Sequence, residues 1–594
     1  MTGRLGVSSS PAGPEAEVVA PLRRALDDAT VKLAVTLVEA MGVVERIEAW
    51  VAQEHRGPGG RPETFSKRTL LVALVLCALT DQPLELTQVT DVLFRQLNAR
   101  WRAELAVPDP PSDPHGWRAA YRSVRHRFHA LVEVMDPSWF PKNRRLDPGA
   151  FEAQAARRQA QHSEGDWAVR YERLDGVVNQ IIEASWSLLP RDVRRSWKGS
   201  LGIDATFVAS FARRPKRRRE GYKKRTPRPI LIHSVDPDAG VYEREADERD
   251  GEDGTAPKSG YGYEATLGVA GPDDDESGFP SLVAGMAVLH RPGAEPGKNG
   301  TRVLATIARR GHRAGWLAGD RAYSSAKAED LQLPARSLGY HPVWDYKDNQ
   351  LGVKDSCQGL NQVEGGWYCP MMPTALVDAS ADVRAGRIDA ERYATRIAER
   401  QTYAARPKAR PSAEGDVRLL CPAAGANPVV RCPLKPRSLT RAPAGSQRIV
   451  LDDEIAEHPP ACCTQETVTV HPEAGAKFAQ DLPYQSPAWH ATYHRLRNAT
   501  EGMNGFLKDP AHEALGDAGR RRVHGVAAQS FFTALLILAA NVRKIRTFLE
   551  QRAIAAGKVR RLPSRRRTRR LSEWLPAAPT TPDAPEGPDP PSSA

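Results

Sequence analysis

The chain has 594 residues, which is enough for several domains and a sizeable hydrophobic core. Its 84 Lys and Arg residues against 72 Asp and Glu give a formal charge of +12. No stretch is long and apolar enough to span a membrane, the first residues lack the pattern of a secretion signal, and the seven cysteines form no regular framework, so we predict a cytoplasmic protein with no membrane partner.

The N-terminal part is predicted to be helical. Residues 1–25 are expected to be a disordered tail and 26–150 a helical DNA-binding domain. Apolar periodicity predicts its first helices over 25–52, 66–80 and 86–97. The last two could form a helix-turn-helix, and a packing or dimerisation hairpin is the equal alternative. Interleaved basic and aromatic residues further on favour DNA.

The middle of the chain predicts an α/β core. Residues 151–198 read as a charged helical connector and 199–345 as the first part of the core. Strand-like runs come first, and a helix over 301–311 then leads to a strand over 315–319. A helix that crosses from antiparallel strands to a strand beside the first is compatible with a mixed sheet.

Residues 346–484 read as a β-rich insertion with one polar helix over 379–404. This insertion holds six of the seven cysteines: Cys357, Cys369, Cys421, Cys432, Cys462 and Cys463. Four thiolates could hold a structural Zn²⁺. There is no Cys-x2-Cys pair, however, and adjacent cysteines are awkward as two ligands of one ion. Spacing alone therefore favours free thiols over zinc.

The C-terminal part returns to the core. Residues 485–555 are expected to form its second part, with an apolar core helix over 527–550. Residues 556–594 are basic and then Pro-rich, which is typical of a disordered tail.

Two aspartates lie in or at the end of apolar strand-like runs. Asp204 is in the centre of 201–208, and Asp320 directly follows 315–319. A carboxylate buried in such a run should be paired or bound to a metal ion. Strand ends are also where open α/β sheets place their functional sites.

A third carboxylate, Glu501, lies in a stretch without proline between 491 and 509, which predicts a helix. At about 100° per residue, its neighbours on one face share a sector of roughly 60°: His494, Arg497, Glu501 and Lys508. An exposed salt-bridged face is the plainer interpretation of a lone helix. The two aspartates upstream favour a site instead.

These motifs resemble the DDE transposases of bacterial insertion sequences. The residues that carry the resemblance are Asp204 in Gly-Ile-Asp-Ala-Thr, Asp320 in Gly-Asp-Arg-Ala-Tyr, and Arg497-x3-Glu501-x6-Lys508. The third motif is similar to that of the group with Tyr-x2-Arg-x3-Glu-x6-Lys, except that His494 stands at the tyrosine position and Tyr493 is one residue early. The resemblance implies a ribonuclease-H-like catalytic core with a β-rich insertion, preceded by a helical N-terminal domain.

The resemblance further implies a function. Asp204, Asp320 and Glu501 would be the catalytic residues and would hold two Mg²⁺ or Mn²⁺ ions, and a homodimer would bind the ends of the element. DNA cleavage would be followed by joining of the 3′-OH ends to target DNA. Contacts to DNA are expected from Tyr493, His494, Arg497 and Lys508.

The resemblance also implies that Trp344 or Trp367 stacks on a flipped base, with an ordinary core tryptophan as the alternative. Two other functions remain open: a metal-dependent nuclease without strand transfer, and a DNA-binding derivative without catalysis.

Overall fold

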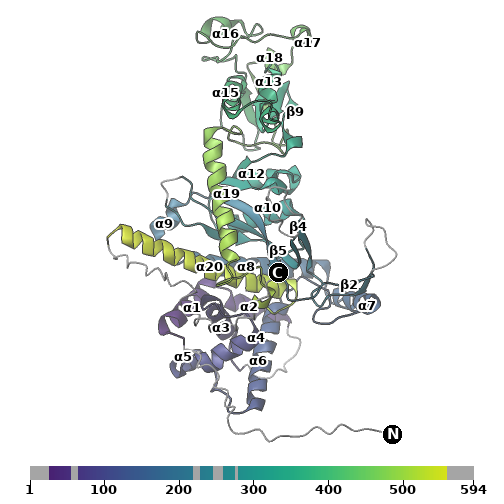
Figure 1. Cartoon of the computed structure of the whole chain (residues 1–594), viewed down its shortest axis with the longest axis vertical. Coiled ribbons are helices and arrows are strands. Elements are labelled where there is room, and N and C mark those ends of the chain that lie inside the picture. Colours follow the sequence, from purple (N-terminus) through teal and green to yellow (C-terminus); the bar gives the residue numbers. More distant parts are fainter. Residues whose placement is uncertain (1–25, 55–63, 219–227, 245–257, 275–277, 558–594) are drawn as a thin grey trace, which may run out of the picture. The chain divides into compact units, whose positions relative to one another are not determined.

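The computed structural model describes residues 26–54, 64–218, 228–244, 258–274 and 278–557 (Figure 1). Both predicted tails lie outside these residues, except for 556 and 557. Parts of a basic block, residues 213–228, and of an acidic block, residues 236–254, also lie outside them. The chain divides into two compact units, Met1–Ile545 and Arg546–Ala594. The sheet, the insertion and the N-terminal helices belong to the first unit.

The N-terminal part is helical, as predicted. Gly42, at φ 58°, ends the first helix in the left-handed conformation, so the single helix expected over 25–52 is two helices. Side chains of Asp27, Ser66 and Asp113 cap helix N-termini. The elements are α1 (Asp28–Met41), α2 (Val44–Glu54), α3 (Lys67–Leu79), α4 (Leu86–Asp91), the π-helical turn η1 (Val92–Gln96), α5 (Ala99–Glu104) and α6 (Pro114–Glu133).

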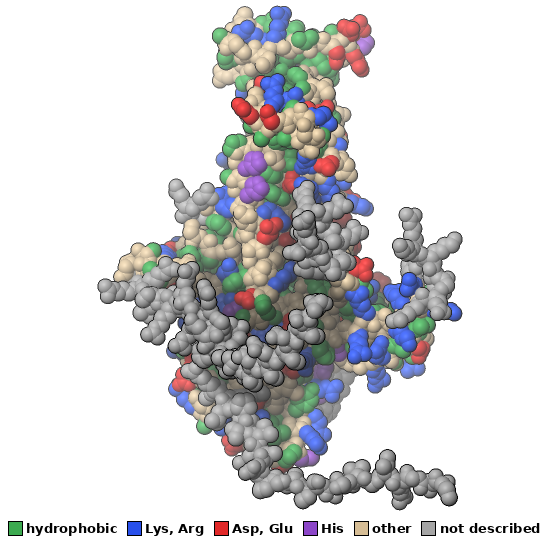
Figure 2. All heavy atoms as spheres, viewed as in Figure 1, with side chains coloured by type: hydrophobic (Ala, Val, Ile, Leu, Met, Phe, Trp, Pro, Cys, Tyr) green, Lys and Arg blue, Asp and Glu red, His purple; other side chains and the backbone are tan. Residues whose placement is uncertain are grey.

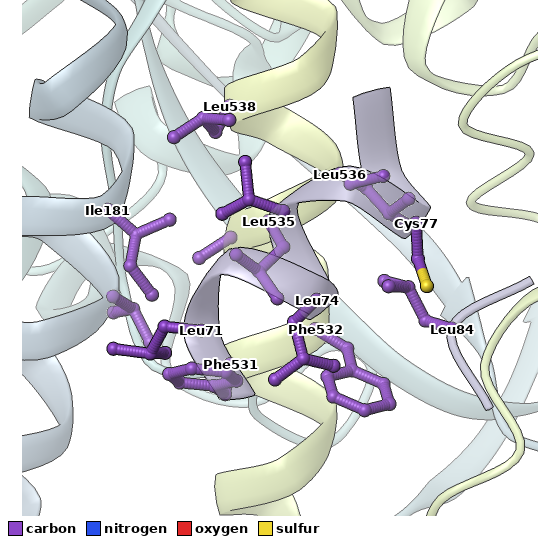
Figure 3. Packing of buried hydrophobic residues seen from close by; sticks show 14 of the residues in the cluster. Leu71, Leu74, Cys77, Leu84, Ile181, Phe531, Phe532, Leu535, Leu536 and Leu538 are labelled. Carbon is purple, nitrogen blue, oxygen red and sulfur yellow. The ribbon is translucent and has the colours of Figure 1, made fainter. Parts of the chain in front are cut away.

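These helices share one hydrophobic core with the sheet and the C-terminal helix. Every residue of α3 from Leu70 to Ala78 is buried, and Leu71 and Leu74 lie beside Phe531 and Phe532 of α20 (Val526–Ala555) (Figure 3). On α4 and η1, the exposed side chains are Thr87 and Arg95. This favours the packing interpretation of the helix pair over a DNA-reading element, because a recognition helix needs an exposed face.

The connector consists of α7 (Pro148–Gln159), α8 (Glu164–Trp186) and α9 (Arg191–Ser196). It leads into a mixed sheet with the order β4-β5-β1-β7-β8, and β6 pairs with β5. In this sheet β1 runs antiparallel to β5 and parallel to β7, which is itself parallel to β8. The strands are β1 (Leu201–Ala209), β4 (Gly240–Arg244), β5 (Lys258–Ala270), β6 (Leu282–Met286), β7 (Trp316–Gly319) and β8 (His341–Trp344).

The predicted mixed α/β class is therefore confirmed, and most of the predicted core strands are present. The strand expected after the basic block is present as β3 (Ile230–Ile232), but it does not belong to the core sheet. It pairs with β2 (Lys216–Arg217) in a separate hairpin. Two short helices, α11 (Arg321–Ser324) and α12 (Gln332–Ser337), connect β7 to β8.

Two long helices cover opposite faces of the sheet. A Cβ atom on Gly268 would meet Val303 of α10 (Pro296–Arg309) at 2.7 Å, and Gly268 pairs with Ile203 of β1. A Cβ on Gly202 would instead meet Thr500 of α19 (Pro487–Leu507). Because successive residues of a strand point to opposite faces, α10 and α19 lie on opposite sides of β1.

The outer edge of β6 is satisfied by side chains rather than by another strand. The amide of Asn541 on α20 accepts from the Val283 N–H at 3.0 Å and donates to the Val283 carbonyl at 2.9 Å. Asn179 on α8 makes the same pair of bonds to Met286, both at 2.9 Å. Buried backbone groups need such partners, so these amides fix α8 and α20 against the sheet.

The insertion contains two three-stranded sheets, with the orders β11-β10-β9 and β12-β13-β14. Its helices contribute as much structure as its strands, although we predicted a β-rich segment. The single helix expected over 379–404 is wrong, because Gly386 at φ 69° separates α14 from α15. The elements are β9 (Val353–Cys357), β10 (Leu360–Val363), β11 (Gly366–Tyr368), α13 (Thr374–Val377), α14 (Ala379–Arg384), α15 (Ala390–Arg400), β12 (Arg406–Pro407), β13 (Val417–Leu420), α16 (Pro436–Arg441), α17 (Asp453–Glu457), α18 (Ala461–Thr464) and β14 (Thr467–Val470).

Gln480 connects the insertion to the core where the chain returns from the insertion to α19. Its side-chain oxygen accepts from the Trp344 N–H at 3.0 Å and from the Trp489 indole N–H at 3.1 Å. Its amide nitrogen donates to the Tyr346 hydroxyl at 2.8 Å. One buried amide therefore joins the end of β8, the start of α19 and the first residues of the insertion.

The apolar helix α20 is longer than predicted, at 30 residues. By length and composition it could cross a membrane, but 94% of its most apolar window is buried within the protein. It is the only such helix among the described residues. Burial of this extent is typical of a core helix.

Replacing Asn541 with Leu should destabilise the protein by about 1–3 kcal/mol, because the Val283 N–H would then be buried without a partner. The midpoint of urea unfolding measures this effect. The control is Asn349→Leu at an exposed position, which should stay within about 0.5 kcal/mol of the wild type. Equal midpoints for the two variants would show that the amide does not hold the edge of β6.

Candidate active site

Two of the predicted site residues follow register-matched positions on neighbouring parallel strands. Ile203 of β1 pairs with Gly319 of β7, and the next residues along the two strands are Asp204 and Asp320. The two carboxylates therefore lie side by side at the carboxyl end of β7. The structure thus brings together two residues that are 116 positions apart (320 − 204).

A third aspartate continues the row, and sequence reasoning missed it. Gly319 pairs with Trp344 at the end of β8, so Asp345 occupies the same position on the next strand. Asp345 accepts from the Arg321 guanidinium at 2.7 Å and from the Tyr484 hydroxyl at 2.7 Å. Asp345 directly follows a short strand, as Asp320 does, and this position in the sequence could have indicated that it belongs to the site.

The helix α19 brings Glu501 to this edge of the sheet. Its closest approach to β1 is at Gly202, where a Cβ atom would lie 1.9 Å from the Thr500 hydroxyl and 2.8 Å from the Leu496 carbonyl. Any other residue at 202 would push the helix away from the strand. Gly202 is therefore a site-forming residue, although it contributes no functional group of its own.

Arg497 lies between carboxylates that come from the sheet and from the helix. Its guanidinium donates to Glu501 at 2.7 Å and lies 3.7 Å from a carboxylate oxygen of Asp204. Burial alone would lower the pKa of Arg497, but the charges of Asp204, Tyr493, Glu501 and Asp320 outweigh it and raise that pKa. The interpretation of this helix face as an exposed salt-bridged surface is thus partly correct, because Arg497 and Glu501 form an ion pair. Arg497 also faces the candidate site.

The environment of Asp204 raises its pKa. Burial, followed by the neighbouring charge of Asp320, raises its pKa to about 6. Arg497 opposes this rise, and so does the backbone N–H of Ala205, which donates to Asp204 at 2.9 Å. Asn504 on α19 also donates to Asp204, at 3.0 Å, and was not predicted. Its position, three residues after Glu501 on the same helix, could have indicated it.

The other predicted residues of α19 have different environments. Tyr493 is buried and stacks on Trp489 at 4.6 Å between ring centroids. Burial and then the charge of Asp345 raise its pKa to about 12, which places its hydroxyl close to the row of aspartates. His494 is exposed and stacks on His490. Lys508 ends the helix and is exposed.

The donor set suits a hard divalent cation. The charge of Asp320 raises the pKa of Asp204, and a bound cation would relieve this repulsion. The buried amide oxygen of Asn504 has no hydrogen-bond partner beside Asp204. In the described part of the chain, no three His, Cys, Asp or Glu side chains are close enough together to form a complete metal site. Arg497 provides positive charge between Asp204 and Glu501.

The two tryptophans differ in environment. Trp344 is fully buried, and its main-chain N–H and carbonyl bond to Gln480 and Trp489. It is therefore a core residue, the alternative that we had weighed against base stacking. Trp367 is half-buried and packs against the cluster that contains Leu360 and Cys462.

Comparisons of the chain with protein-family models, with curated proteins and with solved structures give no match.

Asp204→Asn should stabilise the protein at neutral pH in the presence of a chelator. An acid whose pKa rises from 3.8 to about 6 on folding binds its proton more tightly in the folded state, so stability falls as the pH rises through this window. The penalty above pH 6 is on the order of 2 kcal/mol, and the side chain is only 18% exposed. The Asn variant lacks this penalty because its side chain does not ionise.

The measurement is the difference in unfolding free energy between variant and wild type at neutral pH and near pH 4. The difference should be large at neutral pH and much smaller near pH 4, where the wild-type carboxyl is protonated in the folded state and about half protonated in the unfolded state. A difference that does not change with pH would contradict the expected environment of Asp204.

Proposed function

We propose that this protein is a DDE transposase that binds the ends of an insertion sequence, cleaves the DNA and joins the 3′-OH ends to target DNA. One observation carries the proposal: Asp204 and Asp320 end up side by side on parallel strands, and α19 brings Glu501 towards them. These are the three residues of the motifs described above. Arg497 stands at the arginine position of the third motif.

The order of the sheet supports a ribonuclease-H-like core. Its central strand β1 carries Asp204 and pairs with antiparallel β5 on one side and with parallel β7 on the other. The crossover from β6 to β7 passes through α10. The insertion enters after β8 and returns at α19, between the second aspartate and the glutamate.

Asp204, Asp320 and Glu501 would hold two Mg²⁺ or Mn²⁺ ions, which when bound supply activation of the attacking oxygen and stabilisation of the leaving one. The chain's own residues prepare this site. Arg497 limits repulsion among the carboxylates, and Asn504 orients Asp204 through its hydrogen bond. The Ala205 N–H fixes the other oxygen of Asp204.

Arg497, Lys508, Tyr493 and His494 remain our candidates for contacts to DNA phosphates next to the cleaved bond. A larger candidate surface lies at the β2–β3 hairpin and the adjoining segment before α7, where Lys and Arg side chains gather (Figure 2). We call it the basic patch, and its exposed members are Arg144, Arg145, Arg213, Arg214, Lys216, Arg217, Arg218 and Arg228. Such a surface can neutralise several phosphates.

A nuclease without strand transfer would need the same carboxylates, and a DNA-binding derivative would need the basic patch alone. A homodimer that pairs two element ends, and a cytoplasmic location, belong to the transposase proposal. The distinguishing experiment supplies a pre-cut end with a free 3′-OH together with target DNA. Joined products support the transposase, whereas cleavage without joining supports the nuclease.

Asp204→Asn, Asp320→Asn and Glu501→Gln should each reduce cleavage of a duplex that carries the DNA flanking the gene to background, and leave affinity for that duplex nearly unchanged. Each change removes a charged ligand, whereas affinity comes mainly from cations on phosphates. Cleavage is followed on gels with Mg²⁺, and affinity by fluorescence anisotropy. Glu329→Gln, at a side chain that is 68% exposed, is the matched control and should cleave normally. Wild-type cleavage by any of the three variants would remove that residue from the site.

The double substitution of Lys216 and Arg217 by Ala should weaken DNA binding and reduce its salt dependence. Each lost phosphate contact lowers the slope of log affinity against log salt by about 0.9. The matched control is the double substitution of Arg194 and Arg195 on α9, which are exposed and lie on the opposite side of the molecule in Figure 1. Equal slopes for both double variants would show that the basic patch does not contact DNA.

A further inference from the structure

Three cysteines of the insertion begin the same kind of tight turn. Each is followed by proline, and the third residue after it donates its N–H to the cysteine carbonyl. These bonds are Met372 to Cys369 at 3.0 Å, Ala424 to Cys421 at 2.9 Å and Lys435 to Cys432 at 3.0 Å. Proline at the second position fixes the backbone for such a turn.

In all three turns burial raises the pKa of the thiol, and the backbone N–H two residues after the cysteine lowers it in part. These N–H groups belong to Met371 for Cys369, Ala423 for Cys421 and Leu434 for Cys432. Hydrogen bonds to sulfur favour the thiolate, which is the form that binds metal ions. Cysteines that only fill an apolar core need neither the turn nor the donor, and here both occur three times.

The three turns converge although they come from distant segments. Cys369 follows β11 and Cys421 follows β13, so they extend from different sheets of the insertion. Cys369 and Cys432 are buried in one hydrophobic cluster, and Cys421 packs against it. The pKa of Cys369 is raised to about 12, first by burial and then by the charges of Cys421, Cys463 and Cys432.

Cys463 is the fourth thiol of this group. It lies on α18 in the adjoining cluster, and Leu434 packs against both clusters. Its charge raises the pKa values of Cys421 and Cys432 as well, after the effect of burial. Its own pKa is lowered, first by the hydrogen bond from the Cys462 thiol, at 3.9 Å between the sulfurs, and also by the charge of Lys435.

Cys462 has a different role. Its sulfur lies 3.1 Å from the place where a Cβ on Gly359 would be, so it packs against the turn between β9 and β10. Cys357 and Cys77 lie elsewhere: Cys357 at the end of β9 and Cys77 within α3. Cys462 is also affected by the charges of Cys369 and Cys421, but its contact with the turn between β9 and β10 favours Cys463 as the fourth thiol. Four is the ligand number of a structural zinc site.

We propose that Cys369, Cys421, Cys432 and Cys463 are the ligands of a structural zinc ion that joins the two small sheets of the insertion. Among the residues that the structure describes, no three His, Cys, Asp or Glu side chains are close enough together to hold a metal ion as they stand. Zn–S bonds of about 2.3 Å would draw the four sulfurs inward. Lys435 lies beside the site and offsets part of the negative charge of four thiolates. The ion would stabilise a segment whose two apolar clusters are small.

The first experiment measures zinc by mass spectrometry in the full-length protein purified without chelators. We expect about one ion per chain. Cys→Ser substitution at 369, 421, 432 or 463 should reduce zinc well below half of that amount. The matched controls Cys462→Ser, Cys357→Ser and Cys77→Ser should keep the full amount, and so should Asp204→Asn, which separates this site from the candidate active site.

A second measurement needs no substitution, so it does not depend on the folding of the variants. Replacement of zinc by Co²⁺ in the wild-type protein should give the visible absorption of tetrahedral thiolate coordination. A chelator should accelerate the reaction of four thiols with a thiol reagent. A folded wild-type protein without bound zinc, or with thiol reactivity that a chelator does not change, would overturn the proposal. Loss of zinc in Cys462→Ser but not in Cys463→Ser would overturn the assignment of the fourth ligand.

Discussion

The close contact between β1 and α19 at Gly202 is the constraint on which the candidate active site depends. The helix backbone approaches the strand so closely that a Cβ atom would overlap the Thr500 hydroxyl. Because of this contact, one helix presents a cation, a carboxylate and an amide to the edge where Asp204 and Asp320 lie. The site is therefore a property of helix packing as much as of its charged residues.

The electrostatics of the site follow from that packing. Two aspartates at matched positions on parallel strands repel each other, and burial adds to the cost of charging Asp204. Arg497 offsets part of this cost from the helix, and Arg321 does the same for Asp345 at the end of the row. The buried charges of the site therefore lower the stability of the fold, as is expected of a functional cluster. A rigid sheet is needed to hold these side chains together.

That rigidity comes from elements far away in the sequence. Helices α3 and α20 pack in one core that extends beneath the sheet, and amides from α8 and α20 complete the edge of β6. The insertion is built differently, with small separate clusters around its cysteines. A structural metal ion is the usual remedy for a segment with so little core of its own. One chain thus contains two regions that are stabilised by different means.

The sequence by itself determined the α/β class, most of the strands and the helix that carries Glu501, because periodicity and local motifs are encoded by neighbouring residues. From the same motifs we predicted the three carboxylates of the candidate site. It failed where one glycine breaks a helix, as at Gly42 and Gly386. Only the tertiary structure decided the row of Asp204, Asp320 and Asp345 and the convergence of the cysteines. Strand register and the meeting of distant turns depend on packing between segments far apart in the chain, and no local pattern records them.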